Sequence, residues 1–288
     1  MRIVSLLPAA TQVVRLLGLE SALVGVSHEC ETDGGAVVLT EARVPVGLGA
    51  AETDRRVREL LGRGEALFEL DEAGLRELRP DVVIAQSLCA VCAVDGRQVA
   101  WACVDLGGTR TMEWSPTTLG GVINGVGEVG RLAGAADAGE RAVGELWRRI
   151  GTLPKPTCRR RVVFLEWLDP LFAAGHWVPE LVAAAGGEEL LGRPGEKSGV
   201  VTLEQVRQAD PDVIVTASCG WTAQQTRAAL EELTQQDDWA SLRAVRDGEV
   251  WVADAWAHFT TPGPSLVEAA EGLADAFAGR ESVLLSRL

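Results

Sequence analysis

LRELRPDVVIA (residues 75–85) and QVRQADPDVIVT (residues 205–216) are two copies of one pattern. In each copy an amphipathic helical segment ends at a Pro-Asp pair, and a run rich in Val and Ile follows. Such a run predicts a strand that is buried on both faces, which is typical of parallel sheets with helical connections. The repeat therefore predicts two α/β units built on the same plan.

The openings of the two units also match. RIVSLLPAA (Arg2–Ala10) and RVVFLEWLDP (Arg161–Pro170) each read as a strand, a loop that contains proline and the start of a helix. The helices that follow are expected to end at Gly18 and at Gly186-Gly187. We therefore predict an α/β fold of two Rossmann-like lobes with mostly parallel sheets, at residues 1–114 and 157–288.

Residues 115–156 connect the two lobes in this interpretation. Ser115-Pro116 is a typical helix start, with serine as the cap and proline in the first turn. We expect one long α-helix that joins the lobes stiffly. The stretch GVGEVG (Gly125–Gly130) fits the G-x-G-x-x-G dinucleotide pattern, but helical sequence precedes it where that pattern requires a strand. We interpret these glycines as a small-residue packing face and reject a dinucleotide site.

The composition excludes several classes of partner. Hydrophobic residues make up 47% of the 288, enough for a substantial core, and the net charge of −14 argues against nucleic acid. No apolar run is long enough to span a bilayer, so we expect no membrane insertion. The N-terminal residues read as a strand and helix rather than as a signal peptide. This predicts a cytoplasmic location, or a periplasmic or extracellular one if the start is truncated.

Ligands of open parallel sheets bind beyond the carboxyl ends of the strands. The candidate ligand-binding residues at these positions in the first lobe are Pro8, Ala9, His28, Glu29 and Cys89. In the second lobe they are Glu166, Trp167, His176, Trp177, Cys219, Trp221, Trp256, His258 and Phe259. If the two lobes face each other, these loops line one cleft.

Four tryptophans fall in the predicted strand-end loops of the second lobe: Trp167, Trp177, Trp221 and Trp256. Indole rings offer a large apolar surface, and their N–H groups can donate to a ligand. We expect at least two of the four to form a wall for a large flat or apolar ligand.

AQSLCAVCAV (residues 85–94) places Cys89 and Cys92 three residues apart. A structural zinc site needs four Cys or His ligands, usually as two close pairs, and the sequence has no second C-x-x-C. His28 and Cys30 would complete the four if their loop lies beside this one. A zinc or iron site therefore stays open beside plain packing or ligand contact. A redox pair has weaker support, because Cys89 precedes the nearest predicted helix.

The quoted segments together resemble a known family. RIVSLLPAATQVVRLLGLESALVGVSHEC (residues 2–30), LRPDVVIAQ (residues 78–86) and FLEWLDPLFAAGHWVPELVAAAGG (residues 164–187) are similar to the cobalamin-binding, helical-backbone class of ABC-transporter substrate-binding proteins. The resemblance covers nearly the whole chain. It implies two Rossmann-like lobes on a rigid helix, a metal chelate held between them and an ABC permease as partner.

Our leading hypothesis is a non-enzymatic binding protein for a corrinoid such as cobalamin. His28, His176 or His258 could ligate its cobalt, because imidazole is a suitable donor. The alternative is a cytoplasmic metal-binding or sensing protein that uses His28, Cys30, Cys89 and Cys92. A metal-dependent enzyme with Glu166 as acid or base is less favoured. Nucleophilic catalysis has poor support, since no G-x-S-x-G nucleophile motif is present.

Overall fold

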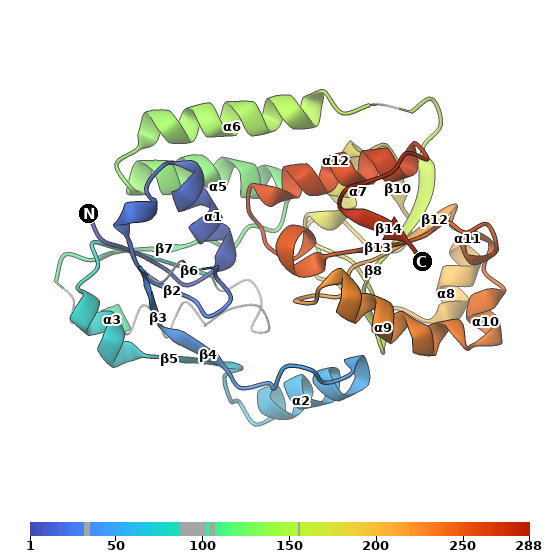
Figure 1. The fold of residues 1–288 in the computed structure, drawn as a ribbon, viewed down its shortest axis with the longest axis horizontal. Helices are drawn as coiled ribbons and strands as arrows, with labels where there is room; N and C mark the ends of the chain where they lie inside the picture. The colour runs from blue at the N-terminus through green and yellow to red at the C-terminus, as the bar shows by residue number, and fades with distance from the viewer. Residues whose placement is uncertain (32–34, 87–98, 100–101, 104–106, 155) are drawn as a thin grey trace. The chain divides into compact units, whose positions relative to one another are not determined.

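The computed structural model describes residues 1–31, 35–86, 99, 102–103, 107–154 and 156–288 (Figure 1). The chain divides into two compact units. Unit 1 comprises residues 1–48, 52–116 and 122–145, and unit 2 comprises residues 49–51, 117–121 and 146–288.

Unit 1 is built on a five-stranded sheet of order β3-β2-β1-β6-β7, in which every neighbouring pair is parallel. Its strands are β1 (Ile3–Ser5), β2 (Leu23–Val26), β3 (Val37–Val38), β6 (Val82–Ala85) and β7 (Arg110–Glu113). The central strands β1 and β6 are buried along their whole length. The apolar run of the first repeat copy is therefore an interior parallel strand, as the sequence predicts.

Short helices and a two-stranded ladder complete unit 1. They are α1 (Pro8–Leu16), η1 (Glu20–Ala22), α3 (Glu72–Leu78) and the antiparallel pair β4 (Thr40–Ala42) and β5 (Phe68–Leu70). Gly18, at φ +72°, follows α1 and ends it where the sequence predicts. Arg79 ends α3 in the left-handed conformation, one residue before Pro80.

The Pro-Asp pairs of the repeat have the same role in both units. Asp81 accepts the backbone N–H of Arg2 at 2.6 Å, and Asp212 accepts that of Arg161 at 2.9 Å. Each carboxylate thus ties the start of one central strand to the start of its neighbour. The repeat that decides the fold therefore has a structural role in both units.

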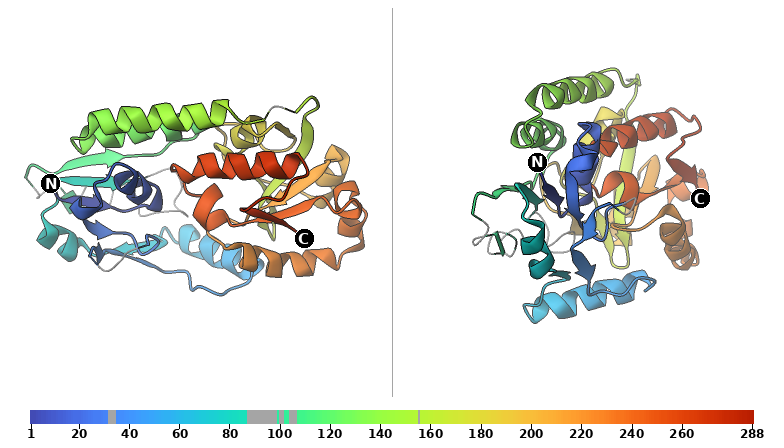
Figure 2. Two further views of the ribbon diagram at one scale, coloured as in Figure 1. Left: turned by 45° about the horizontal axis from the view of Figure 1, so that its top comes forward. Right: turned by 60° about the vertical axis from the view of Figure 1, so that its left-hand side comes forward.

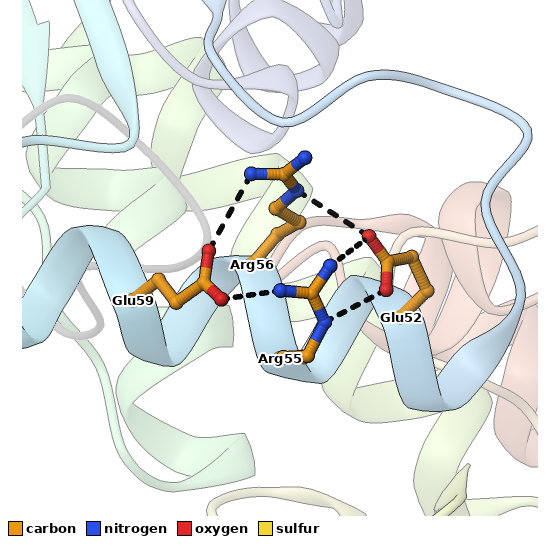
Figure 3. Close-up of polar contacts among 4 residues, drawn as sticks. All are labelled: Glu52, Arg55, Arg56 and Glu59. Carbon is orange, nitrogen blue, oxygen red and sulfur yellow. Dashed lines mark hydrogen bonds and ion pairs between the residues drawn. The ribbon is translucent and has the colours of Figure 1, made fainter.

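Helix α2 (Ala50–Gly62) is covered by charged side chains that pair with one another. Arg55 donates to Glu52 at 2.8 Å and also to Glu59, and Arg56 lies 3.4 Å from the same two carboxylates (Figure 3). Exposed pairs of this kind contribute little to stability. Because the four charges neutralise one another, we assign this helix no part in ligand binding.

Residues 115–156 correct the prediction of a single long helix. They form two helices, α5 (Leu119–Leu132) and α6 (Ala136–Gly151), which run side by side (Figure 2). Gly134, at φ +69°, makes the turn between them. A Cβ on Gly130 would lie 2.9 Å from the Cα of Gly139, so the two backbones touch at these glycines. The predicted small-residue packing face is confirmed, and its partner is α6.

Unit 2 contains a seven-stranded mixed sheet of order β11-β9-β8-β12-β13-β14, with β10 also paired to β8. Strands β8, β10, β12 and β13 run parallel, whereas β9 and β14 run antiparallel to β8 and β13. The strands are β8 (Arg160–Leu168), β9 (Leu171–Ala173), β10 (Gly187–Glu189), β11 (Gly199–Val200), β12 (Val213–Thr216), β13 (Val250–Ala253) and β14 (Leu285–Arg287). The α/β class with mostly parallel sheets is confirmed.

Helices cover both faces of this sheet (Figure 1). The helices are α7 (Val178–Ala184), α8 (Leu203–Ala209), α9 (Ala223–Thr234), α10 (Asp237–Ala240), α11 (Arg243–Arg246) and α12 (Ser265–Phe277). Successive side chains of β8 point to opposite faces of the sheet. Val163 and Leu165 pack in one buried cluster with Leu230 of α9 and Trp239 of α10. Val162 points to the opposite face, which α7 and α12 cover.

Among the described residues, no helix has both the length and the apolar composition that a bilayer span requires.

Candidate functional site

The sheet of unit 2 has a topological switch point between β8 and β12. From β8 the chain continues to β9 and β10 on one side, whereas β12 is followed by β13 on the other side. Ligands of open α/β sheets bind at such points, beyond the carboxyl ends of the strands. The residues that end β8 and follow β12 are therefore the first to consider.

Two tryptophans meet at this switch point. The ring centroids of Trp167 and Trp221 lie 4.8 Å apart, with the rings tilted by 54°. The N–H of Cys219 donates to the carbonyl of Glu166 at 2.9 Å, which fixes the loop after β12 to the end of β8. Nε1 of Trp167 donates to the carbonyl of Asp169 at 3.0 Å. Both rings are held by the backbone around them and are only partly buried.

A third tryptophan joins this pair through a π-helix, η2 (Ala255–Phe259), which follows β13. The carbonyl of Trp221 accepts the backbone N–H groups of Ala255 and Trp256, each at 3.1 Å. Asp254 caps the π-helix by accepting the N–H of Ala257 at 2.9 Å. Short π-helices occur frequently at functional sites. We call the partly exposed residues Trp167, Trp221 and Trp256 the tryptophan wall.

His258 lies on the same π-helix. Its Nδ1 is buried, has no hydrogen-bond partner and lies 4.0 Å from the carboxylate of Glu268. That separation is too long for a hydrogen bond, so nothing there fixes the orientation of the ring.

His176 occupies a strained position at φ +51°, uncommon for a residue with a side chain. Residues 195–196 hold its backbone: His176 donates its N–H to the carbonyl of Glu196 at 2.6 Å, and Gly195 donates to the carbonyl of His176 at 2.9 Å. Its Nε2 is buried and has no partner. Burial lowers the pKa of His176, and Lys197 lowers it further. His176 is thus a neutral imidazole enclosed by the segment that follows β10.

Glu189 anchors that enclosing segment. Its carboxylate accepts the N–H groups of Phe164 at 2.9 Å, Leu191 at 3.1 Å and Gly192 at 3.0 Å. Burial raises the pKa of Glu189 to about 7, against these backbone hydrogen bonds, which lower it. One buried carboxyl group therefore fixes the start of the segment that surrounds His176.

Three predicted contact residues are packing residues in the structure, which corrects their assignment. Trp177 and Phe259 are 5% and 0% exposed, and Nε1 of Trp177 donates to the carbonyl of Phe259 at 2.8 Å. Ala9, in α1 of unit 1, is 0% exposed. Their apolar side chains are enclosed in the cores of their units and present no surface to a ligand. Pro8 is partly exposed at the first position of α1.

In unit 1 the SHEC segment (Ser27–Cys30) follows β2 and carries a network of hydroxyl groups. Thr11 donates to Ser5 Oγ at 2.8 Å, and its Oγ1 lies 3.1 Å from the Sγ of Cys30. Cys30 is buried, and burial raises the pKa of its thiol. The sulfur therefore faces a hydroxyl group of its own unit as a neutral thiol.

His28 points differently from its neighbour Cys30. Its ring is half-buried, lies 5.5 Å from the ring of Phe68, and holds Nδ1 2.7 Å from Thr40 Oγ1. Burial lowers the pKa of His28, and Glu41 opposes this effect. Next to it, burial raises the pKa of Glu29 to about 7. At neutral pH this loop presents a neutral imidazole beside a carboxyl group that is partly protonated.

The structure describes two of the four predicted metal ligands, His28 and Cys30. Cys89 and Cys92 lie outside the described residues. Within the described ranges, no three His, Cys, Asp or Glu side chains come together as a metal cage. The zinc or iron site of His28, Cys30, Cys89 and Cys92 therefore stays a prediction. Cys30, turned toward Thr11, lends it no support.

Two open depressions of about 300 Å³ each lie elsewhere on the surface. Arg15, Glu20 and Glu31 are among the residues that line the first, and Arg161 and Leu190 among those of the second. Neither is lined by the tryptophan wall or by a histidine. The candidate ligand surface is thus the tryptophan wall rather than either of these depressions.

Comparison with known proteins places the chain in a family. The sequence model of the family described as "Periplasmic binding protein" matches residues 3–256. The chain belongs to this family. A cobalamin-binding protein of Halobacterium salinarum is 25% identical over 283 residues, which cover 96% of this chain and 69% of the relative.

Solved structures of periplasmic binding proteins share the fold. The haem-binding protein of Roseiflexus sp. RS-1, in its apo form, has a TM-score of 0.70 at 20% identity, with 96% of this chain and 98% of that chain covered. The vitamin B12 binding protein of Vibrio cholerae has a TM-score of 0.63 at 20% identity, with 96% of each chain covered. The resemblance predicted from the sequence is confirmed at the level of family and fold.

Three residues that shape the candidate site escaped the sequence analysis. They are Thr40, which holds His28; Glu189, which anchors the segment around His176; and Asp254, which caps the π-helix. Asp254 follows an apolar strand directly and precedes WAHF, a signal that could have identified it as a cap. Thr40 and Glu189 act across the tertiary fold, and no local pattern marks them.

Proposed function

We propose that this periplasmic binding protein family member binds a metal chelate of the tetrapyrrole type, with a corrinoid such as cobalamin as its ligand. It is a binding protein and carries out no chemical reaction on the chelate. Its role is that of a substrate-binding protein.

The tryptophan wall is the observation that carries this proposal. Trp167 and Trp221 lie in contact at the switch point of the unit 2 sheet, where open α/β sheets take their ligands. Partly exposed indole rings suit a large ligand with apolar faces and polar edges, since they combine apolar area with an N–H donor. A macrocyclic chelate has both features.

The curated relative favours a corrinoid over other chelates. Its similarity extends over 96% of this chain, so both units take part in the match. A free metal ion is less favoured as the ligand, because the described residues form no cage of three or more metal-binding side chains. The metal-binding or sensing alternative, which uses His28, Cys30, Cys89 and Cys92, depends on two residues outside the described ranges.

Retention on gel filtration tests the proposal. Purified protein is incubated separately with aquocobalamin, ferric haem and zinc sulfate, and each mixture is passed over a desalting column. We expect aquocobalamin to elute with the protein and to quench its tryptophan fluorescence. Retention of ferric haem alone would overturn the corrinoid assignment but keep the chelate class. If zinc is retained and neither chelate is, the metal-binding alternative replaces the proposal.

An ABC permease is the partner that the family suggests. Reconstituted permease and ATPase from the same gene neighbourhood should hydrolyse ATP faster when the loaded protein is added. An unchanged rate with such a pair would contradict this part of the proposal.

A further inference from the structure

The three histidines of the chain differ in how their rings are held. In unit 2, Nε2 of His176 and Nδ1 of His258 are buried without hydrogen-bond partners. In unit 1, the ring of His28 is hydrogen-bonded through Nδ1 to Thr40 Oγ1 at 2.7 Å. Within the part of the chain that the structure describes, His28 is therefore the only histidine whose ring is oriented by a hydrogen bond.

The hydroxyl group of Thr40 joins three partners. It accepts the backbone N–H of His28 at 2.9 Å and donates its single proton to Ser27 Oγ at 3.1 Å. Ser27 Oγ in turn accepts the N–H of Glu29 at 3.3 Å. With the Thr40 proton directed at Ser27, Thr40 Oγ1 is free to accept a ring proton from Nδ1 across the short contact of 2.7 Å.

We take the ring proton of His28 to lie on Nδ1, where Thr40 Oγ1 can accept it. With the proton on Nδ1, the lone pair of the imidazole lies on Nε2. A neutral histidine with Nδ1–H bonded to an acceptor is the usual arrangement of a metal-ligating histidine, because the second bond orients the ring and raises its basicity.

The surroundings of His28 suit a metal that already has most of its ligands. Cys30, the soft donor two residues further along the chain, turns its sulfur to Thr11 Oγ1 at 3.1 Å. Within the described ranges, no second and third protein ligand stand beside His28. Among the described residues a bare ion would therefore find fewer than three donors there, whereas a metal chelate with an open axial position needs only one.

We propose that Nε2 of His28 is the axial ligand of a metal chelate, and that Thr40 is the positioning residue that presents it. This inference rests on the proposed function. It adds a protein side chain that coordinates the metal of the chelate. The chemistry it selects is a chelated metal with a displaceable water on one face, as in aquocobalamin or ferric haem.

Electron paramagnetic resonance on the protein with bound cob(II)inamide tests the proposal. This corrinoid lacks a nucleotide base, so any axial nitrogen must come from the protein. We expect each cobalt line to split into three by coupling to one ¹⁴N nucleus, and into two when the protein is labelled with [¹⁵N]histidine. The splitting should vanish in His28→Ala and persist in His176→Ala and His258→Ala. Its persistence in His28→Ala would overturn the assignment.

Variants of Thr40 test the positioning role. Thr40→Val keeps the shape of the side chain and removes the hydroxyl group, so we expect the affinity for aquocobalamin to fall about 10–100-fold, as for other partners of metal ligands. Thr40→Ser keeps the hydroxyl group and should restore both the affinity and the absorption shift that accompanies ligation. Equal affinities and spectra for the two variants would refute the role of Thr40.

The two proposals fail in different ways. If the wild-type protein retains neither aquocobalamin nor ferric haem, the proposed function is wrong and this inference is wrong with it. If a chelate is retained with the same spectrum in wild-type protein and His28→Ala, the function stands and the axial contact is wrong.

Discussion

The indole rings of Trp167 and Trp221 lie 4.8 Å apart, one at the end of β8 and the other in the loop after β12. The bond from Cys219 N–H to the carbonyl of Glu166 holds these two chain segments together. The pair is therefore pre-organised by the backbone, and a ligand that stacks on it loses little conformational freedom.

Replacing one ring of this pair should weaken binding. We expect Trp221→Ala to lower the affinity for aquocobalamin at least about tenfold, since aromatic contacts of this kind contribute about 1 kcal/mol beyond the buried area. Trp147→Ala is the matched control, because Trp147 is 40% exposed on α6 and lies outside the tryptophan wall. Equal losses in both variants, measured by fluorescence titration, would contradict the assignment of the wall.

Glu189 should control the local opening of the segment that follows it. Glu189→Gln replaces one acceptor oxygen by an NH₂ group. Either the N–H of Phe164, bound to one oxygen, or those of Leu191 and Gly192, bound to the other, then lose their acceptor. We expect hydrogen exchange at these amides to accelerate about five- to tenfold, the equivalent of one lost hydrogen bond. The exposed neighbour supplies the control: Glu188→Gln should leave the exchange rates unchanged. No acceleration in Glu189→Gln would show that the carboxylate does not anchor the segment.

The raised carboxyl pKa values predict that stability falls as the pH rises. Burial raises the pKa of Glu29 and of Glu189 from 4.5 to about 7, so between these values the folded chain holds protons that the unfolded chain has lost. The free energy of unfolding should therefore decrease from about pH 4.5 to just above pH 7, by about 3 kcal/mol for each group.

His28 and His176 act in the opposite sense. Their lowered pKa values make stability rise with pH up to about 6.5, the ordinary pKa of a histidine in an unfolded chain. The comparison of variants, rather than the total for the wild type, is therefore the test. Urea unfolding across this range should show a smaller decrease in Glu189→Gln and in Glu29→Gln, and an unchanged decrease in both would contradict the prediction.

Gly175 allows the close approach of the segment around His176. A Cβ at this position would lie 2.7 Å from the carbonyl carbon of Lys197. We expect Gly175→Ala to lower the free energy of unfolding by about 1–3 kcal/mol, the usual range for overpacking. Gly199→Ala, whose Cβ would meet no atom within 4 Å, should change it far less. Equal unfolding midpoints for the two variants would contradict this packing.

The sequence predicts the fold well where one local signal controls it. The two Pro-Asp strands are buried parallel strands because an unbroken Val/Ile run can only lie between covered faces. The predicted single helix over residues 115–156 is wrong, because the alanines around Gly134 favour a helix and no proline interrupts them. The turn depends on the contact of Gly130 with Gly139, which no local pattern encodes.

The sequence predicts which residue types occur at the candidate site better than it predicts how their side chains are arranged. Strand-end tryptophans are visible in the sequence, but which of them stay exposed depends on tertiary packing, as the burial of Trp177 shows. The contact that orients the ring of His28 comes from Thr40, a residue of β4 that is twelve positions away in the sequence. The cytoplasmic location and the interlobe position of the ligand stay predictions of the sequence.

Native mass spectrometry of the full chain with aquocobalamin tests the central claim most directly. The account predicts one chelate bound per chain, in a complex that survives a competing excess of free imidazole and is weakened in Trp221→Ala. A spectrum that shows only the unliganded chain with aquocobalamin, and again with ferric haem, would contradict it.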